Sequence, residues 1–192
     1  MKSKCFREEK IKGLVEGRIT QFREIIKPQP DSIFHGMPII KSDNQIGAKD
    51  IKPRFKVGEI CYIKEPYFIK KHLLREDVEY KYWYSQNPFK SSVMKWRNPI
   101  TMAAHQARFF LEITAVRSEN VCGISDEDCK KEGIICDGGG DSFRFYYEGS
   151  KLTYPTPKEA FAAQFNAINE KNAFENMVWV WVIDFKLLKQ KP

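Results

Sequence analysis

The sequence has 192 residues, of which 42% are hydrophobic and 14% aromatic, and this composition excludes an intrinsically disordered chain. Lysine and arginine outnumber aspartate and glutamate by 32 to 25, and the formal net charge of +7 favours a polyanionic partner such as nucleic acid without requiring one. The five cysteines are odd in number and contain no CxxC pair, so we expect no disulfide framework and no zinc site. We also expect no other metal site and no cofactor.

A short helix and a strand are the first predicted elements. Residues 1–12 carry charges throughout, unlike a secretory signal, so we expect a cytoplasmic protein. Residues 5–16 are predicted to form a helix, because their apolar side chains share one face and Gly17 is placed to end it. The following stretch, "RITQFREII", is rich in β-branched and aromatic residues and is predicted to be a strand, which the prolines of "KPQP" end.

The middle of the chain contains two predicted strands and two longer segments outside the predicted barrel, called the first and second excursions below. Residues 31–54 contain scattered Asp, Ser, Asn and Gly residues and are predicted to run over the surface. A turn at Val57-Gly58 leads into the predicted strand "EICYIK". Residues 67–106 form a second excursion, which is aromatic, basic and broken by prolines. The stretch "RFFLEITAVR" that follows it is predicted to be a strand.

The last third is predicted to contain two helices, a hairpin and a buried strand. Ser125 can cap a short helix in "SDEDCKKEG", and "CDGGGDSFRFYYEGSKLTYP" favours a hairpin. Thr156 and Glu159 form a capping box before the helical stretch "PKEAFAAQFNAINEK". The apolar run in "MVWVWVIDFKLL" is far shorter than the ~20 residues of a membrane helix, so we expect a strand and no membrane partner. Because strands outnumber short helices, the predicted class is α+β, a mixed β-barrel decorated with short helices.

Five motifs in this order resemble the ASCH domain family of the PUA-like superfamily, in particular its phage and prophage members. They are "GRITQFREIIKPQP", "VGEICYIKE", "LEIT", "SDEDCKKEGI" and the terminal "WVIDF". The family run at the first motif is similar to "GRKTQTRRVIKPQP". The resemblance implies a single ASCH/PUA-like domain over residues 1–192, with insertions at roughly 31–54 and 67–106, encoded by a phage or prophage. It also implies a barrel with a cleft beside the first helix, and RNA or a modified nucleoside as ligand.

Small bacterial members of the family hydrolyse N4-acetylcytidine to cytidine, and the residues of that reaction are only partly present here. The resemblance places Ile19 at the position of the family's lysine and Phe22 at that of its threonine. Glu132 corresponds to its glutamate. The family's arginine at the position of Glu24 is also absent, although Arg23 is retained.

These replacements favour a binding module over an enzyme, because isoleucine can act neither as a base nor as a nucleophile. Glu132 remains the candidate catalytic residue, as a general base on water. The alternative for Glu132 is a solvated residue at a helix end. Ile19 and Phe22 are three positions apart on a predicted strand and are expected to point to opposite faces. One of them should then form an apolar wall of the cleft, and the other should enter the core.

The first motif supplies candidate ligand-binding residues. Arg18 and Arg23 have the fork geometry that suits a phosphate or a base edge, and Thr20 lies between them. The alternative is ordinary charge pairing at the surface, for example between Arg23 and Glu24.

Two further candidates for ligand binding lie at strand ends. Glu65 follows a predicted strand and is suited to accept a hydrogen bond from the exocyclic amine of a base. The alternative is a salt bridge from Glu65 to Lys64 or Arg108. Arg108 is itself a candidate for contact with the ligand.

Aromatic and basic residues alternate in "YKYWYSQNPFKSSVMKWRN". Such interleaving suits single-stranded nucleic acid, because aromatic rings stack on unpaired bases while cations hold the backbone. Trp96 and Arg97 are the candidates for this role. For Tyr80, Tyr82 and Tyr84, packing on a barrel wall is the favoured alternative.

The resemblance and the charge together predict one site. We expect Arg18 or Arg23 to line one concave pocket together with Glu65 and Glu132. An apolar wall there raises the pKa of at least one carboxylate unless an arginine compensates, and Arg23 and Arg108 are expected to do so.

Three functions remain open from the sequence. The leading hypothesis is a module that binds RNA or a nucleotide. The first alternative is an amidohydrolase of acylated nucleosides such as N4-acetylcytidine, in which Glu132 works with a rearranged set of partners. The second is a module that binds a host protein through its two excursions. The oligomeric state is left open.

Overall fold

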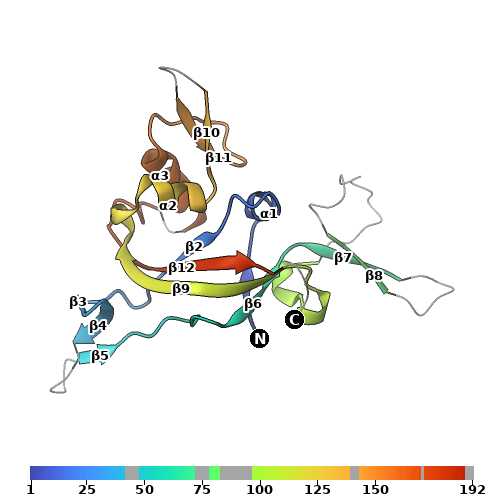
Figure 1. The fold of residues 1–192 in the computed structure, drawn as a ribbon, viewed down its shortest axis with the longest axis horizontal. Helices are drawn as coiled ribbons and strands as arrows, with labels where there is room; N and C mark the ends of the chain where they lie inside the picture. The colour runs from blue at the N-terminus through green and yellow to red at the C-terminus, as the bar shows by residue number, and fades with distance from the viewer. Residues whose placement is uncertain (42–47, 72–77, 83–96, 139–142, 170, 189–192) are drawn as a thin grey trace.

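The protein has a mixed α+β fold with several sheets and few short helices (Figure 1). This confirms the predicted α+β class, whereas the predicted barrel is not found among the described strands. The computed structural model describes residues 1–41, 48–71, 78–82, 97–138, 143–169 and 171–188.

The largest sheet has five strands. Their order is β1 (Lys2–Cys5), β6 (Ile60–Lys64), β9 (Phe110–Asn120), β12 (Trp179–Leu187) and β2 (Gln21–Ile25). β1 pairs with β6 in parallel, and the other neighbours are antiparallel. The four strands predicted from the sequence are therefore confirmed, as β2, β6, β9 and β12. β1 and β2 are the two edges, and no pairing within the described part of the chain joins them into a closed barrel.

The core against this sheet combines aliphatic side chains with a cluster of phenylalanine rings. Phe22 of β2 is fully buried there. Its ring centroid lies 6.0 Å from that of Phe6, 5.7 Å from that of Phe55 and 5.8 Å from that of Phe185. Edge-on and tilted contacts of this kind suit the charge distribution of aromatic rings. The cluster fixes β2 against the N-terminal segment, and with it the charged residues next to Phe22.

The predicted first helix is present as α1 (Glu8–Val15). Its buried face contains Ile11 and Leu14, whereas Val15 is 46% exposed. Gly17 follows with a φ of 72°, a conformation that favours glycine and that ends the helix as predicted. The prediction began the helix too early, because residues up to Cys5 form β1, an edge strand whose lysines and serine give no apolar alternation.

A second layer packs α2 (Asp126–Lys131), α3 (Pro157–Ile168) and the hairpin of β10 (Ile134–Asp137) and β11 (Arg144–Tyr147) (Figure 1). The predicted caps are confirmed. Ser125 Oγ accepts a hydrogen bond from the Asp128 amide, and Thr156 Oγ1 accepts one from the Glu159 amide, both at 3.2 Å. Short 3₁₀ helices cover Pro99–Thr101, Ala104–Gln106 and Val121–Gly123.

Both excursions contain strands. The first holds a sheet of β3 (Ser32–Phe34), β4 (Met37–Lys41) and β5 (Ala48–Asp50), which corrects the prediction of a simple surface path. The β3–β4 turn uses positive φ angles at His35 and Gly36, as tight hairpins require. The second holds a hairpin of β7 (Tyr67–Lys71) and β8 (Val78–Tyr82), and the two units project at opposite ends of the molecule (Figure 1). Their proposed role in binding a host protein stays a prediction.

Replacing Gly13 with alanine is expected to destabilise the protein by about 1 kcal/mol, although alanine favours a helix by a similar amount. The added Cβ would lie 2.7 Å from Ile19 Cδ1, and Ile19 is buried, so overpacking of about 1–3 kcal/mol outweighs the helical gain. The double variant Gly13→Ala/Ile19→Ala should be more stable than the sum of the single changes, because the new methyl group fills part of the cavity. Urea denaturation checks this, and strictly additive effects would contradict the contact.

Candidate functional site

A cleft of about 750 Å³ lies between the N-terminal segment with α1, strand β2, strand β11 and helix α3. Its place beside the first helix agrees with the expected position of a ligand cleft. Aromatic side chains contribute much of its wall, namely Phe6, Phe22, Tyr147, Phe161 and Phe165. Its cationic residues are Lys4, Arg7, Lys10, Arg23 and Lys27, and its acidic residues are Glu9, Glu24, Glu132 and Glu148.

Arg23 lies at the inner end of this cleft as the centre of a buried ionic cluster. Its side chain is only 1% exposed, and Nη1 lies 3.1 Å from Glu132 Oε1. Nη2 lies 3.1 Å from Glu119 Oε1 and 3.5 Å from Asp128 Oδ2. The Phe161 ring covers the guanidinium at 5.4 Å. The predicted alternative of a surface pair with Glu24 is therefore wrong, since Glu24 pairs with a lysine on the neighbouring segment.

Glu132 connects this cluster to the first helix. The carboxylate is 2% exposed, and its Oε2 accepts a hydrogen bond from Lys10 Nζ at 2.8 Å. Glu132 ends α2, where its amide donates to the Asp128 carbonyl and the φ of 100° at Gly133 turns the chain. The alternative of a solvated residue is wrong, because the carboxylate is buried and paired with both Lys10 and Arg23. Lys10 was not predicted, because the resemblance places its lysine at a different position in the chain.

Ile19 and Phe22 do not point to opposite faces, contrary to the prediction. Both are buried in the same apolar core, at 3% and 1% exposure. The alternation of a strand does not apply to Ile19, because β2 begins only at Gln21. Phe22 also lines the cleft, so a single residue supplies both the apolar wall and the core contact.

Glu65 lies elsewhere, and its predicted place in one pocket with Glu132 is wrong. Its carboxylate is 1% exposed and accepts two hydrogen bonds from Arg108, at 2.6 Å from Nε and 2.7 Å from Nη2. Glu65 follows β6, and two strands separate β6 from β2 in the sheet. Burial raises the pKa of Glu65, and the hydrogen bond and charge of Arg108 offset only part of that rise. The alternative of a salt bridge to Arg108 is confirmed.

Arg18 and Thr20 lie outside the residues that line the cleft. Arg18 Nε donates a hydrogen bond to Glu16 at 2.7 Å, and its guanidinium lies 3.7 Å from Glu148, which does line the cleft. Thr20 is exposed, and its backbone joins two elements: its amide donates to the Lys131 carbonyl, and its carbonyl accepts from the Phe185 amide. Of the first-motif candidates, only Arg23 reaches the cleft.

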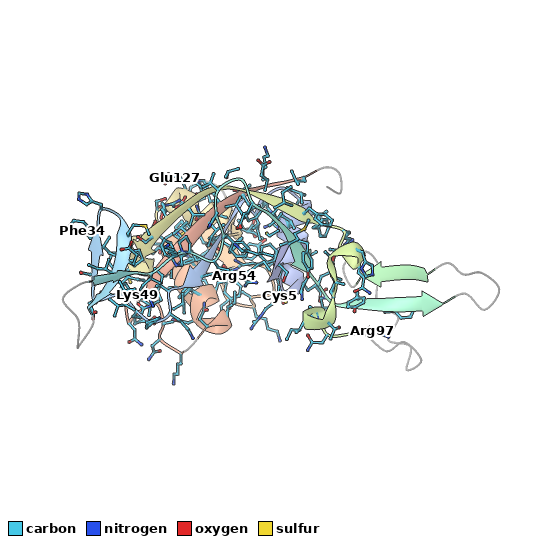
Figure 2. The ribbon with its side chains drawn as sticks, turned by 90° about the horizontal axis from the view of Figure 1, so that it is seen from below. Cys5, Phe34, Lys49, Arg54, Arg97 and Glu127 are labelled. Carbon is cyan, nitrogen blue, oxygen red and sulfur yellow. The ribbon has the colours of Figure 1, made fainter. Side chains whose placement is uncertain are left out.

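Of the aromatic and basic candidates, the structure describes Arg97, which does not line the cleft. Arg97 is exposed, and its amide donates to the Tyr67 carbonyl at 2.7 Å. Figure 2 shows Arg97 beside the projecting β7–β8 hairpin. Trp96 and Tyr84 lie outside the described residues.

The charges around the cleft are only partly paired. Lys4 Nζ lies 2.7 Å from Glu24 Oε1 and 4.8 Å from the centre of the Phe22 ring. Arg7, by contrast, is exposed, and its side chain makes no hydrogen bond or ion pair with any residue that the structure describes. The rim therefore offers at least one cation whose charge is available to an anionic ligand.

The pKa of Asp128 depends on burial and on the cations around it, including Arg23. Burial alone raises its pKa, but the hydrogen bond from Lys131 and the charges of Arg117 and Arg23 outweigh burial and leave the pKa below its ordinary value. The carboxylate is therefore ionised at neutral pH and contributes to a cluster that opposite charges stabilise.

Within the described residues, no group of three or more His, Cys, Asp or Glu side chains is arranged to hold a metal ion. In the same part of the chain, no helix is both long enough and apolar enough to cross a membrane. The chain matches no family model, no curated protein and no solved structure.

Proposed function

We propose that this chain is an ASCH-like module with a PUA-like arrangement, which holds RNA or a nucleotide in the cleft beside α1. The observation that carries the proposal is the composition of that cleft, where aromatic rings and cationic side chains line one concave volume. Aromatic faces stack on unpaired bases, and cations hold phosphates, so the two kinds of residue together suit a nucleotide. The net charge of +7 supports the same class of ligand.

The inner and outer parts of the cleft are suited to bind different parts of a nucleotide. Phe161 and Phe22 belong to the buried inner wall, where a base would be covered. Arg7 is at the exposed rim and has the free charge that a phosphate needs. A nucleotide would thus enter base first, with its phosphate held at the rim.

The experiment is a titration of labelled single-stranded RNA and of nucleoside monophosphates at low and moderate salt. We expect affinity to fall steeply as salt rises, because binding releases counterions. The variant Arg7→Glu should bind at least about fivefold more weakly, and it should show a smaller salt dependence. Lys158→Glu makes the same charge change at an exposed position of α3 outside the cleft and should bind as the wild type does. The absence of binding at low salt would overturn the proposal.

A second candidate function, hydrolysis of an acylated nucleoside, is supported by the contact between Lys10 and Glu132. The sequence lacks the expected lysine at position 19, but α1 places another lysine 2.8 Å from the candidate general base. In such a reaction Glu132 would take a proton from water as the water oxygen attacks the acyl carbon. The proton would then pass to the leaving amine, and the carbon–nitrogen bond would break to give a free carboxylic acid. Lys10 and Arg23 would stabilise the negative oxygen of the intermediate.

Incubation with N4-acetylcytidine, followed by chromatography of cytidine, tests this second function. If the protein hydrolyses the compound, Lys10→Met should reduce the rate by at least about 100-fold. Lys12→Met is the matched control, because Lys12 lies on the same helix, is 40% exposed and pairs with Glu148 rather than Glu132. Equal effects of the two variants would contradict a catalytic role for Lys10.

A further inference from the structure

One polar side chain on the cleft wall has no partner among the described residues. Helix α3 faces the cleft with Phe161, Gln164, Phe165 and Ile168, which follow the spacing of a single helix face. Among these otherwise apolar residues, Gln164 is 7% exposed. Its side-chain amide makes no hydrogen bond with any residue that the structure describes.

The Gln164 amide is nevertheless not sealed inside the protein. Among the described residues, Arg23 Nε is the one side-chain polar atom that is both fully enclosed and unpaired. The amide atoms of Gln164 are therefore accessible, and the space available to them is the cleft. Buried polar groups in proteins are nearly always hydrogen-bonded, so this amide, which the described residues leave unpaired, is available to bond to water or to a ligand that enters the cleft.

We propose that Gln164 determines which base the cleft accepts, by pairing its amide with the hydrogen-bonding edge of that base; this rests on the proposed binding of a nucleotide. A glutamine side chain carries a C=O acceptor next to an N–H donor. A base edge that presents a donor next to an acceptor can therefore form two hydrogen bonds with it. Adenine is the base that glutamine matches best in this way. Phe161 and Phe165, three residues before and one residue after Gln164, line the same cleft and make the wall beside its amide apolar.

Phosphate recognition is a poorer explanation for Gln164. Its amide carries no charge, while the cleft already contains cationic side chains, of which Arg7 is free. A purely structural role is also a poor explanation, because such a role would require a partner within the protein. Base selection and phosphate affinity should therefore depend on different residues and can be separated by experiment.

The test is calorimetric titration of the four common nucleoside monophosphates at one low salt concentration. We expect the wild type to prefer AMP over the weakest of the four by about tenfold or more, as a paired base edge typically allows. Gln164→Leu keeps the size of the side chain but removes the amide. In this variant AMP should bind more weakly, so that the affinities of the four nucleotides differ by less than about twofold. Ala163→Leu places the same side chain on the same helix outside the cleft and should keep the preference. Arg7→Glu should weaken all four nucleotides equally.

The outcomes separate this inference from the proposed function. Binding of all four nucleotides with equal affinity by the wild type overturns the role of Gln164 and leaves the nucleotide site intact. Failure of the wild type to bind any nucleotide or RNA overturns both. If thermal melting shows that Gln164→Leu is unfolded, Gln164→Glu replaces it in the test. A carboxylate has no amide N–H to donate, so this variant must change the order in which the four nucleotides are preferred. An unchanged order in that variant also overturns the inference.

Discussion

Replacing Arg23 with methionine is expected to lower the free energy of unfolding by about 3–5 kcal/mol. The side chain is 1% exposed and lies within 3.5 Å of carboxylate oxygens of Glu119, Asp128 and Glu132. Methionine fills much of the same volume but leaves these carboxylates without their central cation. Removing one partner of a buried ion pair is costly for this reason, because the remaining charge is desolvated and uncompensated.

Urea denaturation at neutral pH measures this loss, and Arg117→Met is the control. Arg117 contacts Asp128, Glu119 and Asp184, but its side chain is 42% exposed. Solvent screens such contacts, so we expect a loss of no more than about 1 kcal/mol for this variant. Similar losses for the two variants would show that burial does not determine the strength of the cluster.

The same cluster predicts a pH dependence with a definite sign. The folded protein holds the pKa of Asp128 below its ordinary value of 3.8, so the carboxylate stabilises the fold above that value. This contribution is lost as the pH falls through the lower folded pKa. In Arg23→Met one of the charges that lowers the pKa is missing, so the difference in stability between variant and wild type should shrink on acidification. A difference that grows toward low pH would contradict this.

The elements that local sequence determines were predicted best. The strand β12 and the helix α3 each combine a strong pattern with a recognisable end, such as the cap at Thr156. β1 and the three strands of the first excursion were missed, because they are short or lack apolar alternation. The pairing of β1 also depends on a neighbour distant in sequence, as in the parallel register of Lys2 with Cys61.

The candidate site was predictable only where the motif itself supplies the residues. The structure places Arg23 and Glu132 together, although 109 positions separate them. Glu65 lies apart from them in the structure. The sequence could not show this, because a position at a strand end does not determine on which side of the sheet the side chain lies. Lys10 and Gln164 carry no sequence signal, since a lysine on an amphipathic helix and a glutamine among apolar residues are both common. Only the packing of α1 and α3 around the cleft places these two side chains there.

Replacing Glu132 with glutamine is expected to strengthen the binding of nucleoside monophosphates by about tenfold at low salt. The glutamine keeps the size of the side chain and one oxygen, which can take the place of the carboxylate oxygen facing either Lys10 or Arg23. It removes the negative charge that these two cations now compensate. A unit charge about 10 Å from a phosphate contributes roughly 1.7 kcal/mol at an effective dielectric constant of about 20, which corresponds to more than a tenfold change in affinity.

The control for this variant is Glu127→Gln, which removes an exposed charge from the same helix outside the cleft (Figure 2). It should change affinity less than about twofold, because solvent and salt screen the exposed carboxylate. If the protein instead hydrolyses acylated nucleosides, Glu132→Gln should abolish turnover, because a neutral amide cannot take the proton from water, while binding of the uncleaved compound persists. Tighter nucleotide binding without any wild-type turnover would favour the binding module. Weaker nucleotide binding by folded Glu132→Gln would contradict the electrostatic account of the cleft, because it would mean that the carboxylate contacts the ligand directly.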